Sequence, residues 1–327
     1  MHVVHRCVSL AVAICITACT VLAQQETISI RSDLVRVPVT VLDRSGRYVP
    51  GLNQKDFRVF ENGVEQEISY FEAADEPFTV LLLLDVSGSM RSYMDEVARG
   101  TATFISQLRP NDTVAIATFT DDSEIHLILK PTQRQDFEQV ISLKAPNVEH
   151  TFTTTFDAVD KALKMLTRIR GRKAVIFFSD GEQFGRKATA KSNLRDAEEQ
   201  EALVYPIQFG DHPNVDPDLW RSTMGPFDKV PHPVTRSDIE KLTRRVNEYM
   251  TGLAERTGGR RFKIMSLTDL VKTFRSITEE LGRTYTLGYQ PSTSSHDNER
   301  RTITVKVASR DVAVRSRNEV IYKQTAK

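Results

Sequence analysis

Cysteine is scarce in this sequence, and its few examples lie close to the N-terminus. The 327-residue chain has three cysteines, Cys7, Cys15 and Cys19. All three fall inside a segment that has the features of a targeting sequence. Once this segment is removed, the chain has no cysteine, or only one that lipidation retains. Disulfide bonds, zinc–thiolate sites and cysteine nucleophiles are therefore excluded.

The sequence also lacks an excess of charge and, after its first residues, a long apolar run. Its net charge is +1, which gives no indication of bulk electrostatic binding to nucleic acid. No stretch beyond the targeting segment is long and apolar enough to span a bilayer. A composition of 40% hydrophobic and 27% charged residues is typical of a folded globular protein, and 327 residues suffice for about two domains.

Residues 1–23 have the pattern of a signal peptide. A basic start at Arg6 precedes an apolar stretch, residues 8–21, which is shorter than the ~20 residues that a spanning helix needs. The short side chains of Val21 and Ala23 predict cleavage after Ala23.

A competing interpretation of the same segment is a lipid anchor. The letters "ITAC" at residues 16–19 resemble a bacterial lipobox, which would leave Cys19 as a lipidated N-terminus. In both cases we expect an exported protein that is periplasmic, secreted or lipid-anchored at the cell envelope.

The hydrophobic pattern divides the remaining chain into three regions. Residues 28–76 alternate apolar and polar side chains at period two, which predicts an N-terminal β region. In residues 78–281 strands alternate with helices, which predicts an α/β domain with a doubly wound, mostly parallel, Rossmann-like sheet. Residues 283–325 read as four short strands.

The two β regions each form a thin sheet with an unmatched apolar face. Within the first region, the apolar face carries Val35, Val37, Val39 and Val41. Two such sheets stacked together would bury both faces. We therefore predict that the α/β domain is inserted in, or flanked by, a small β-sandwich formed from both chain ends. The alternative is two separate β pieces that pack on the α/β domain.

Oxygen-bearing side chains follow two apolar strands of the predicted sheet. Asp85 ends the strand "FTVLLLLD" and is followed by Ser87 and Ser89, and Asp180 ends the strand "VIFFSD". Ligands bind at this carboxyl edge of open α/β sheets. Neighbouring carboxylates repel each other unless a cation lies between them, and oxygen ligands favour a hard cation. Mg²⁺ is our first choice, with Mn²⁺ and Ca²⁺ as alternatives.

A simpler role for these serines is helix capping. Ser and Asp are common at helix starts, so Ser89 or Ser92 could cap the helix expected after the strand. The second apolar strand, which ends in Ser179-Asp180-Gly181, favours the metal site over capping.

The D-x-S-x-S motif, a later threonine and a later S-D-G resemble the von Willebrand factor A domain and its metal-ion-dependent adhesion site. The resemblance covers roughly residues 78–281 and implies that Asp85, Ser87, Ser89 and Asp180 belong to that site. The flanking stretches "VPVTVLDRSGRYVPGLNQKDFRVFENGVEQEISYF" and "YTLGYQP" are similar to the acidobacterial-type VWFA-related family of exported proteins.

The family's threonine precedes the helix "FDAVDKAL". Counting back from Asp157 places it at Thr153, where the usual G-G-T is replaced by Thr-Phe-Thr. Because both glycines are missing, Thr154 or Thr155 could serve instead.

The resemblance implies a binding function. Ser87, Ser89 and Thr153 would coordinate the cation directly, and the two aspartates would act through bridging waters. An Asp or Glu of a partner protein would complete the coordination shell. The alternatives are a structural component of a cell-envelope assembly, in which the metal only stabilises the fold, and a metal-assisted hydrolase.

We expect no enzyme activity. Ser87 stands where the aspartyl-phosphate motif D-x-D-x-T has its second aspartate. The sequence also contains no G-x-S-x-G nucleophile motif and no P-loop lysine motif.

Three further residues are candidates for the rim of the site. Trp220, the single tryptophan, lies in a proline-rich loop that we expect at the same sheet edge; it could contact a partner or pack on the core. Asp121 and Asp122 form a turn or else place charge near the ion. The basic stretch "RIRGRK", residues 168–173, is expected to be solvated at the opposite edge.

Overall fold

The computed structural model describes residues 34–120, 124–137, 143, 154–180, 187–210, 235–309 and 311–322. The expected signal peptide and Cys19 lie outside these residues. No helix in the described ranges is long and apolar enough to cross a membrane.

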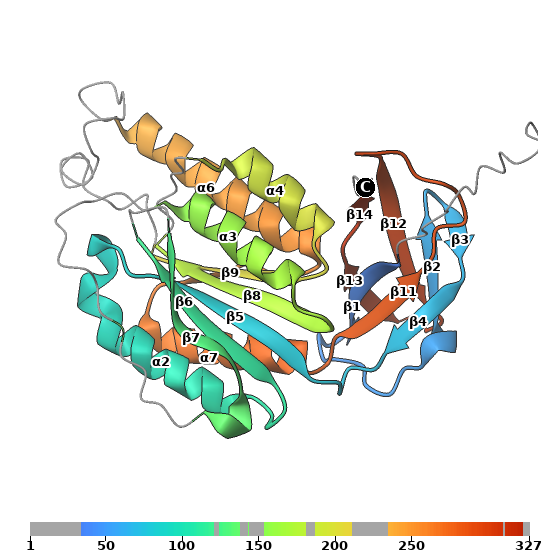
Figure 1. The fold of residues 1–327 in the computed structure, drawn as a ribbon, viewed down its shortest axis with the longest axis horizontal. Coiled ribbons are helices and arrows are strands. Elements are labelled where there is room, and N and C mark those ends of the chain that lie inside the picture. The colour runs from blue at the N-terminus through green and yellow to red at the C-terminus, as the bar shows by residue number, and fades with distance from the viewer. Residues whose placement is uncertain are drawn as a thin grey trace, which may run out of the picture. The chain divides into compact units, whose positions relative to one another are not determined.

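A six-stranded sheet forms the centre of the α/β domain, with strand order β10-β9-β8-β5-β6-β7 (Figure 1). Its strands are β5 (Phe78–Asp85), β6 (Thr113–Phe119), β7 (Ile125–Gln133), β8 (Arg172–Ser179), β9 (Leu203–Phe209) and β10 (Phe262–Ile264). All neighbouring strands are parallel except β6 and β7, which pair antiparallel. The central position of β5 and β8 explains why both are continuous apolar runs, since strands covered on both faces have no polar side.

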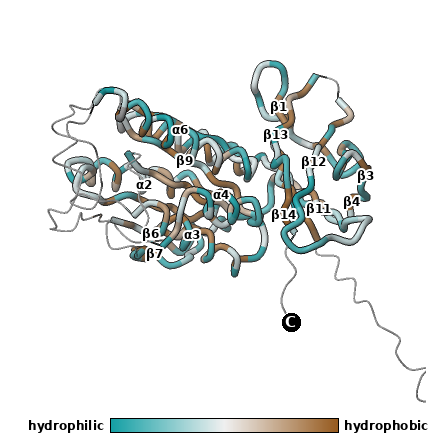
Figure 2. The backbone as a smooth tube through the Cα atoms, turned by 90° about the horizontal axis from the view of Figure 1, so that it is seen from above, coloured by the Kyte–Doolittle hydropathy of each residue, from teal (hydrophilic) through white to brown (hydrophobic). Residues whose placement is uncertain are grey.

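Helices cover both faces of this sheet (Figure 1). One face carries α2 (Met94–Gln107) and α7 (Leu267–Leu281), and the other carries α3 (Thr155–Thr167), α4 (Ala190–Glu199) and α6 (Arg236–Thr257). Successive residues of β5 enter opposite cores, because side chains alternate across a strand: Leu82 packs with α2 and α7, and Leu83 packs with α3, α4 and α6. In Figure 2, hydrophilic residues predominate along α6, as expected for a helix with a solvent-facing side.

Two four-stranded sheets form a β-sandwich beside the α/β domain, with strand orders β13-β1-β11-β4 and β14-β12-β2-β3. Their strands are β1 (Val35–Asp43), β2 (Phe57–Glu61), β3 (Val64–Gln66), β4 (Ile68–Glu72), β11 (Tyr285–Tyr289), β12 (Arg300–Val307), β13 (Val312–Ser316) and β14 (Glu319–Ile321). Short 3-10 helices are η1 (Gln54–Asp56), η2 (Gly88–Tyr93) and η3 (Arg134–Asp136).

Each sheet of the sandwich combines strands from both ends of the chain. β1 pairs with β11, and β2 pairs with β12. Val35, Val37, Val39 and Val41 are all buried in a core that both sheets share. The predicted fold class is therefore confirmed, and the α/β domain is inserted in the sandwich. The alternative of two separate β pieces is wrong.

Arginines of the sandwich contact carboxylates of the α/β domain. Arg36 binds Glu201 at 2.9 Å, and Arg300 binds the buried Glu198 at 2.7 Å. Arg315 contacts Glu280, which is also fully buried. Because a buried charge is stable only when it is paired, these ion pairs fix the sandwich against the domain.

The expectation for the basic stretch is wrong in its second half. Arg168 and Arg170 are exposed, but Arg172 and Lys173 are buried. Arg172 donates hydrogen bonds to the backbone oxygens of Ala74, Glu76 and Leu281, where the chain passes between the sandwich and the domain. The sandwich covers this edge of the sheet, so these cations meet carbonyl groups instead of water.

Gly259 marks a close backbone approach between the end of α6 and β9. A Cβ atom at this position would lie 2.1 Å from the carbonyl oxygen of Val204. We expect Gly259→Ala to lower the free energy of unfolding by about 1–3 kcal/mol, because the backbone must shift to accept the methyl group. Urea denaturation measures the change. Gly88→Ala is the control, since its methyl group meets no atom within 4 Å; equal stability of the two variants would contradict the prediction.

Candidate functional site

Asp85 is the last residue of β5 and is completely buried at the carboxyl edge of the central sheet. Its Oδ1 atom accepts a hydrogen bond from the backbone N–H of Ser87 at 2.9 Å. Its Oδ2 atom accepts one from the hydroxyl of Ser179 on the neighbouring strand β8, at 2.7 Å. The carboxylate is thus held between the loop that follows β5 and the end of β8.

The surroundings of Asp85 disfavour its negative charge. Burial, together with the negative charge of Asp180, raises the pKa of its carboxyl to about 7. Asp180 directly follows β8 and is partly exposed. The charge of Asp180 thus acts on Asp85 across the neighbouring ends of β5 and β8. A bound cation would stabilise the ionised form of both.

Ser87 and Ser89 place two hydroxyl groups beside Asp85. Their Oγ atoms lie 3.1 Å apart; Ser87 is buried and Ser89 is exposed. Ser87 precedes η2, but its side chain makes no capping hydrogen bond there. The next helix, α2, has Tyr93 as its N-cap residue and likewise has no side-chain cap. Neither helix start therefore has a side-chain cap of the kind that the capping interpretation requires.

The predicted threonine ligand and the rim residues cannot be placed. Thr153, Asp121, Asp122 and Trp220 all lie outside the described residues. The two alternatives to Thr153 are described and are buried. Of these, Thr154 donates its hydroxyl to the backbone oxygen of Thr120 at 2.9 Å, which attaches the start of α3 to the end of β6.

Two residues that contact this region were missed in the sequence. Ser179 was read only as part of S-D-G, although it donates to Asp85. No role of its own was predicted for Asp157 from the sequence. In the structure it is 3% exposed and accepts hydrogen bonds from two backbone N–H groups. A signal was present for Asp157, since an acidic residue stands in the first turn of a predicted helix.

The donor set fits a hard divalent cation. Asp85, Ser87, Ser89 and Asp180 offer only carboxylate and hydroxyl oxygens, which suit Mg²⁺, Mn²⁺ or Ca²⁺ better than softer metals. Within the described ranges, no group of three or more His, Cys, Asp or Glu side chains could hold a metal. A site here would therefore depend on serine hydroxyls as well as carboxylates.

Comparison with known proteins finds a similarity for the part of the chain that carries these residues. Residues 80–183 match the family model of the von Willebrand factor type A domain. No curated protein matches the chain.

Similar solved structures come from several sources. BatB from Bacteroides thetaiotaomicron is 16% identical over 63% of this chain and 98% of its own, with a TM-score of 0.42. A von Willebrand factor type A protein from Catenulispora acidiphila is 12% identical over 82% and 74%, with a TM-score of 0.43. The ArnB paralog VWA2 from Sulfolobus acidocaldarius is 11% identical over 89% and 76%, with a TM-score of 0.41. On the family match, residues 80–183 are similar to the von Willebrand factor type A domain.

Proposed function

We propose that this protein is an exported binding module that captures a protein partner through a divalent cation at the carboxyl edge of its central sheet. The observation that carries the proposal is the arrangement around Asp85. This carboxyl is fully buried, lies within the electrostatic influence of Asp180, and is followed by two serine hydroxyls in mutual contact. Such an arrangement is unfavourable without a cation and favourable with one.

The cation would be held by Asp85, Ser87, Ser89 and Asp180, together with Thr153. When bound, it would offer a coordination position to an Asp or Glu side chain of the partner. The chain's own contribution is to hold the ligands ready: the Ser179 hydroxyl and the Ser87 N–H fix both oxygens of Asp85. Mg²⁺ is our first choice, and Mn²⁺ and Ca²⁺ are alternatives.

The rim of the site and the route of export complete the proposal. Trp220, Asp121 and Asp122 would contact the partner around the cation. Export would follow cleavage after Ala23 or lipidation of Cys19.

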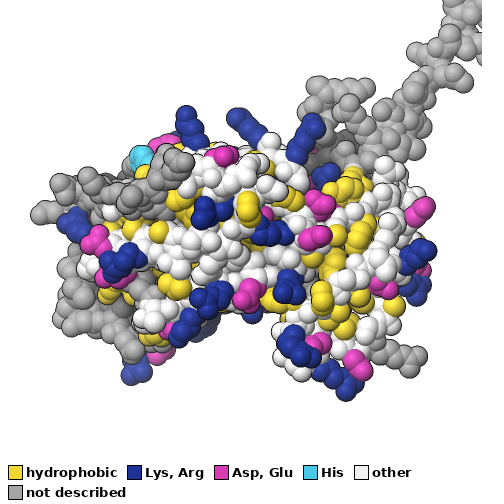
Figure 3. Space-filling model, turned by 90° about the horizontal axis from the view of Figure 1, so that it is seen from below, with side chains coloured by type: hydrophobic (Ala, Val, Ile, Leu, Met, Phe, Trp, Pro, Cys, Tyr) yellow, Lys and Arg dark blue, Asp and Glu magenta, His cyan; other side chains and the backbone are white. Residues whose placement is uncertain are grey.

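An interaction role agrees with the family match, since von Willebrand factor type A domains are in general interaction modules. On the face shown in Figure 3, positive and negative side chains of the described residues are interspersed. Such a surface suits recognition through a localised site better than through a uniform electrostatic field.

We expect the purified protein to bind Mg²⁺, Mn²⁺ or Ca²⁺ saturably in calorimetric titration, and to stay folded when EDTA removes the cation. The fold should survive because hydrophobic cores on both faces of the central sheet and inside the sandwich stabilise it independently of the cation. Circular dichroism after EDTA treatment checks this second point. If the chain unfolds in EDTA, the cation is structural, and this result favours the alternative of a structural component in a cell-envelope assembly. If no cation binds, the proposal fails.

A further inference from the structure

Asp157 connects two segments at the carboxyl edge of the central sheet. It lies in the first turn of α3 and is 3% exposed. Its Oδ1 atom accepts hydrogen bonds from the backbone N–H groups of Lys187 at 3.0 Å and Ala188 at 2.7 Å. These two residues precede α4 and belong to the connection that leaves β8 through Asp180. The start of α3 is therefore attached to the far end of that connection.

Further hydrogen bonds join the neighbouring segments of the same edge. The backbone N–H and the hydroxyl of Thr154 both donate to the backbone oxygen of Thr120, each at 2.9 Å. The N–H of Val86 donates to the backbone oxygen of Phe119 at 3.0 Å. The loop after β5, the end of β6, the start of α3 and the approach to α4 thus form one connected series, and Asp157 makes its last link.

We infer that Asp157 is a positioning residue of the proposed metal site. It does not need to touch the cation, because its role is to fix the start of α3 relative to the connection that begins at Asp180. Anchoring Lys187 and Ala188 limits the length of chain between Asp180 and the next fixed point, which reduces the freedom that Asp180 would lose on cation binding and so favours binding. Residues that hydrogen-bond to metal ligands typically alter metal affinity by about 10–100-fold, and we expect an effect of this order for Asp157. The inference rests on the proposed function and names a residue on which the affinity of that site depends.

A single oxygen of Asp157 receives both N–H groups, and this permits a sharp test. Asparagine has a carbonyl oxygen in the same place but no charge, so Asp157→Asn keeps the acceptor and Asp157→Ala removes it. A positioning role requires the oxygen, whereas a purely electrostatic role requires the charge. The two roles therefore predict different results for the asparagine variant.

The matched control is Asn193→Ala. Asn193 is also fully buried and also attaches α4 to α3, donating to the backbone oxygen of Phe156 at 2.9 Å and to the hydroxyl of Tyr249 at 2.8 Å. It lies inside α4, beyond the connection that follows Asp180. Its loss should reduce thermal stability and leave cation affinity unchanged.

The experiment is calorimetric titration of Mg²⁺ and Mn²⁺ into the purified wild type and these three variants, with a thermal melt of each. We expect Asp157→Ala to bind about 10–100-fold more weakly. The cation affinity of Asp157→Asn should stay within about threefold of the wild-type value, and the affinity of Asn193→Ala should equal the wild-type value. Unchanged affinity of Asp157→Ala, or equal weakening of both Asp157 variants, would overturn the positioning role. Absence of binding in the wild type would instead overturn the proposed function.

If Asp157→Ala does not fold, Lys187→Pro tests the same link from its other side. Proline removes one of the two N–H donors and leaves Asp157 in place. Weaker cation binding by a folded Lys187→Pro protein supports the inference, and wild-type affinity contradicts it.

Discussion

Replacement of Asp85 by alanine should abolish divalent-cation binding while the protein remains folded. The variant removes one of the two carboxylates of the proposed site and leaves the serine hydroxyls, which hold a divalent ion poorly without it. Saturable heat in calorimetric titration should fall below detection. The same loss is expected for Asp180→Ala.

The fold should tolerate this change because two effects oppose each other. Alanine leaves the Ser179 hydroxyl and the Ser87 N–H without their acceptor, which destabilises the fold by about 1–3 kcal/mol for each donor that water cannot reach. Removing a buried carboxyl that repels Asp180 stabilises the fold. Thermal melts in EDTA compare the two proteins without the contribution of bound metal.

The control for Asp85→Ala is Asp85→Asn, which preserves the size of the side chain and an acceptor oxygen. It should also lose cation binding, because the carboxylate and not the shape is required. Wild-type affinity in either Asp85 variant would disprove the site assignment.

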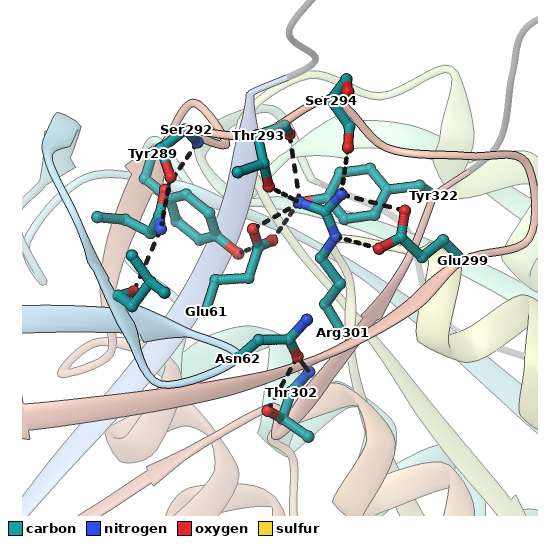
Figure 4. A network of polar contacts seen from close by, with 12 residues as sticks. Glu61, Asn62, Tyr289, Ser292, Thr293, Ser294, Glu299, Arg301, Thr302 and Tyr322 are labelled. Carbon is teal, nitrogen blue, oxygen red and sulfur yellow. Dashed lines mark hydrogen bonds and ion pairs between the residues drawn. The ribbon is translucent and has the colours of Figure 1, made fainter.

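The second large effect is expected in the sandwich, where Arg301→Met should lower the free energy of unfolding by about 3–5 kcal/mol. Arg301 and Glu61 are both almost fully buried and form an ion pair of 2.9 Å (Figure 4). Without the guanidinium, the Glu61 carboxylate remains in the core with no opposite charge. Its remaining partners are the hydroxyls of Tyr289 and Tyr322, which cannot neutralise it.

The surroundings of this pair explain why the loss should be large. The guanidinium also donates to Glu299 at 2.7 Å, to the Thr293 hydroxyl at 3.0 Å and to the Ser294 backbone oxygen at 2.6 Å (Figure 4). Burial together with the Glu61 carboxylate raises the pKa of both tyrosines, so their hydroxyls stay protonated and donate. One substitution would therefore leave the buried Glu61 carboxylate without its cation and break the guanidinium's links to Glu299, Thr293 and Ser294.

Urea denaturation of Arg301→Met measures this effect, and Arg58→Met provides the control. Arg58 pairs with Glu65 on the surface, with both side chains about half exposed, so its loss should cost under about 1 kcal/mol. The double variant Glu61→Leu/Arg301→Met should recover part of the stability, since no unpaired charge remains. A loss below about 1 kcal/mol in Arg301→Met would show that Glu61 does not depend on this arginine.

The fold could be predicted from the sequence because its elements have clear hydrophobic periods. The alternation from Val35 to Val41 predicted a one-sided strand, and the apolar run before Asp85 predicted a strand covered on both faces. The sandwich followed from the need to bury two unmatched sheet faces. These features depend on local pattern, so a single sequence displays them.

The contacts that hold the candidate site could not be predicted in this way. Ser179, which donates to Asp85, lies 94 positions away from it in the sequence. Asp157 accepts from backbone N–H groups, which no residue type marks in a sequence. The contacts that join sandwich and domain were also missed: Arg172 stands in a basic stretch that was expected to be solvated, and Glu198 stands in a polar segment without a recognisable motif. Their burial depends on which surface the sandwich covers, and that is a tertiary property.

The insertion of the α/β domain between the two halves of the sandwich sets an order of folding. Val35 pairs with Tyr289 and Val59 pairs with Val305, so β1 and β2 must wait for partners that follow the α/β domain in the chain. Closing such long loops is entropically unfavourable until the intervening domain has folded and brought its own two ends together. We therefore expect the sandwich to be the last part to assemble. Until then β1 and β2 have unpaired edges, and a chaperone that shields extended apolar segments would protect the chain at this stage.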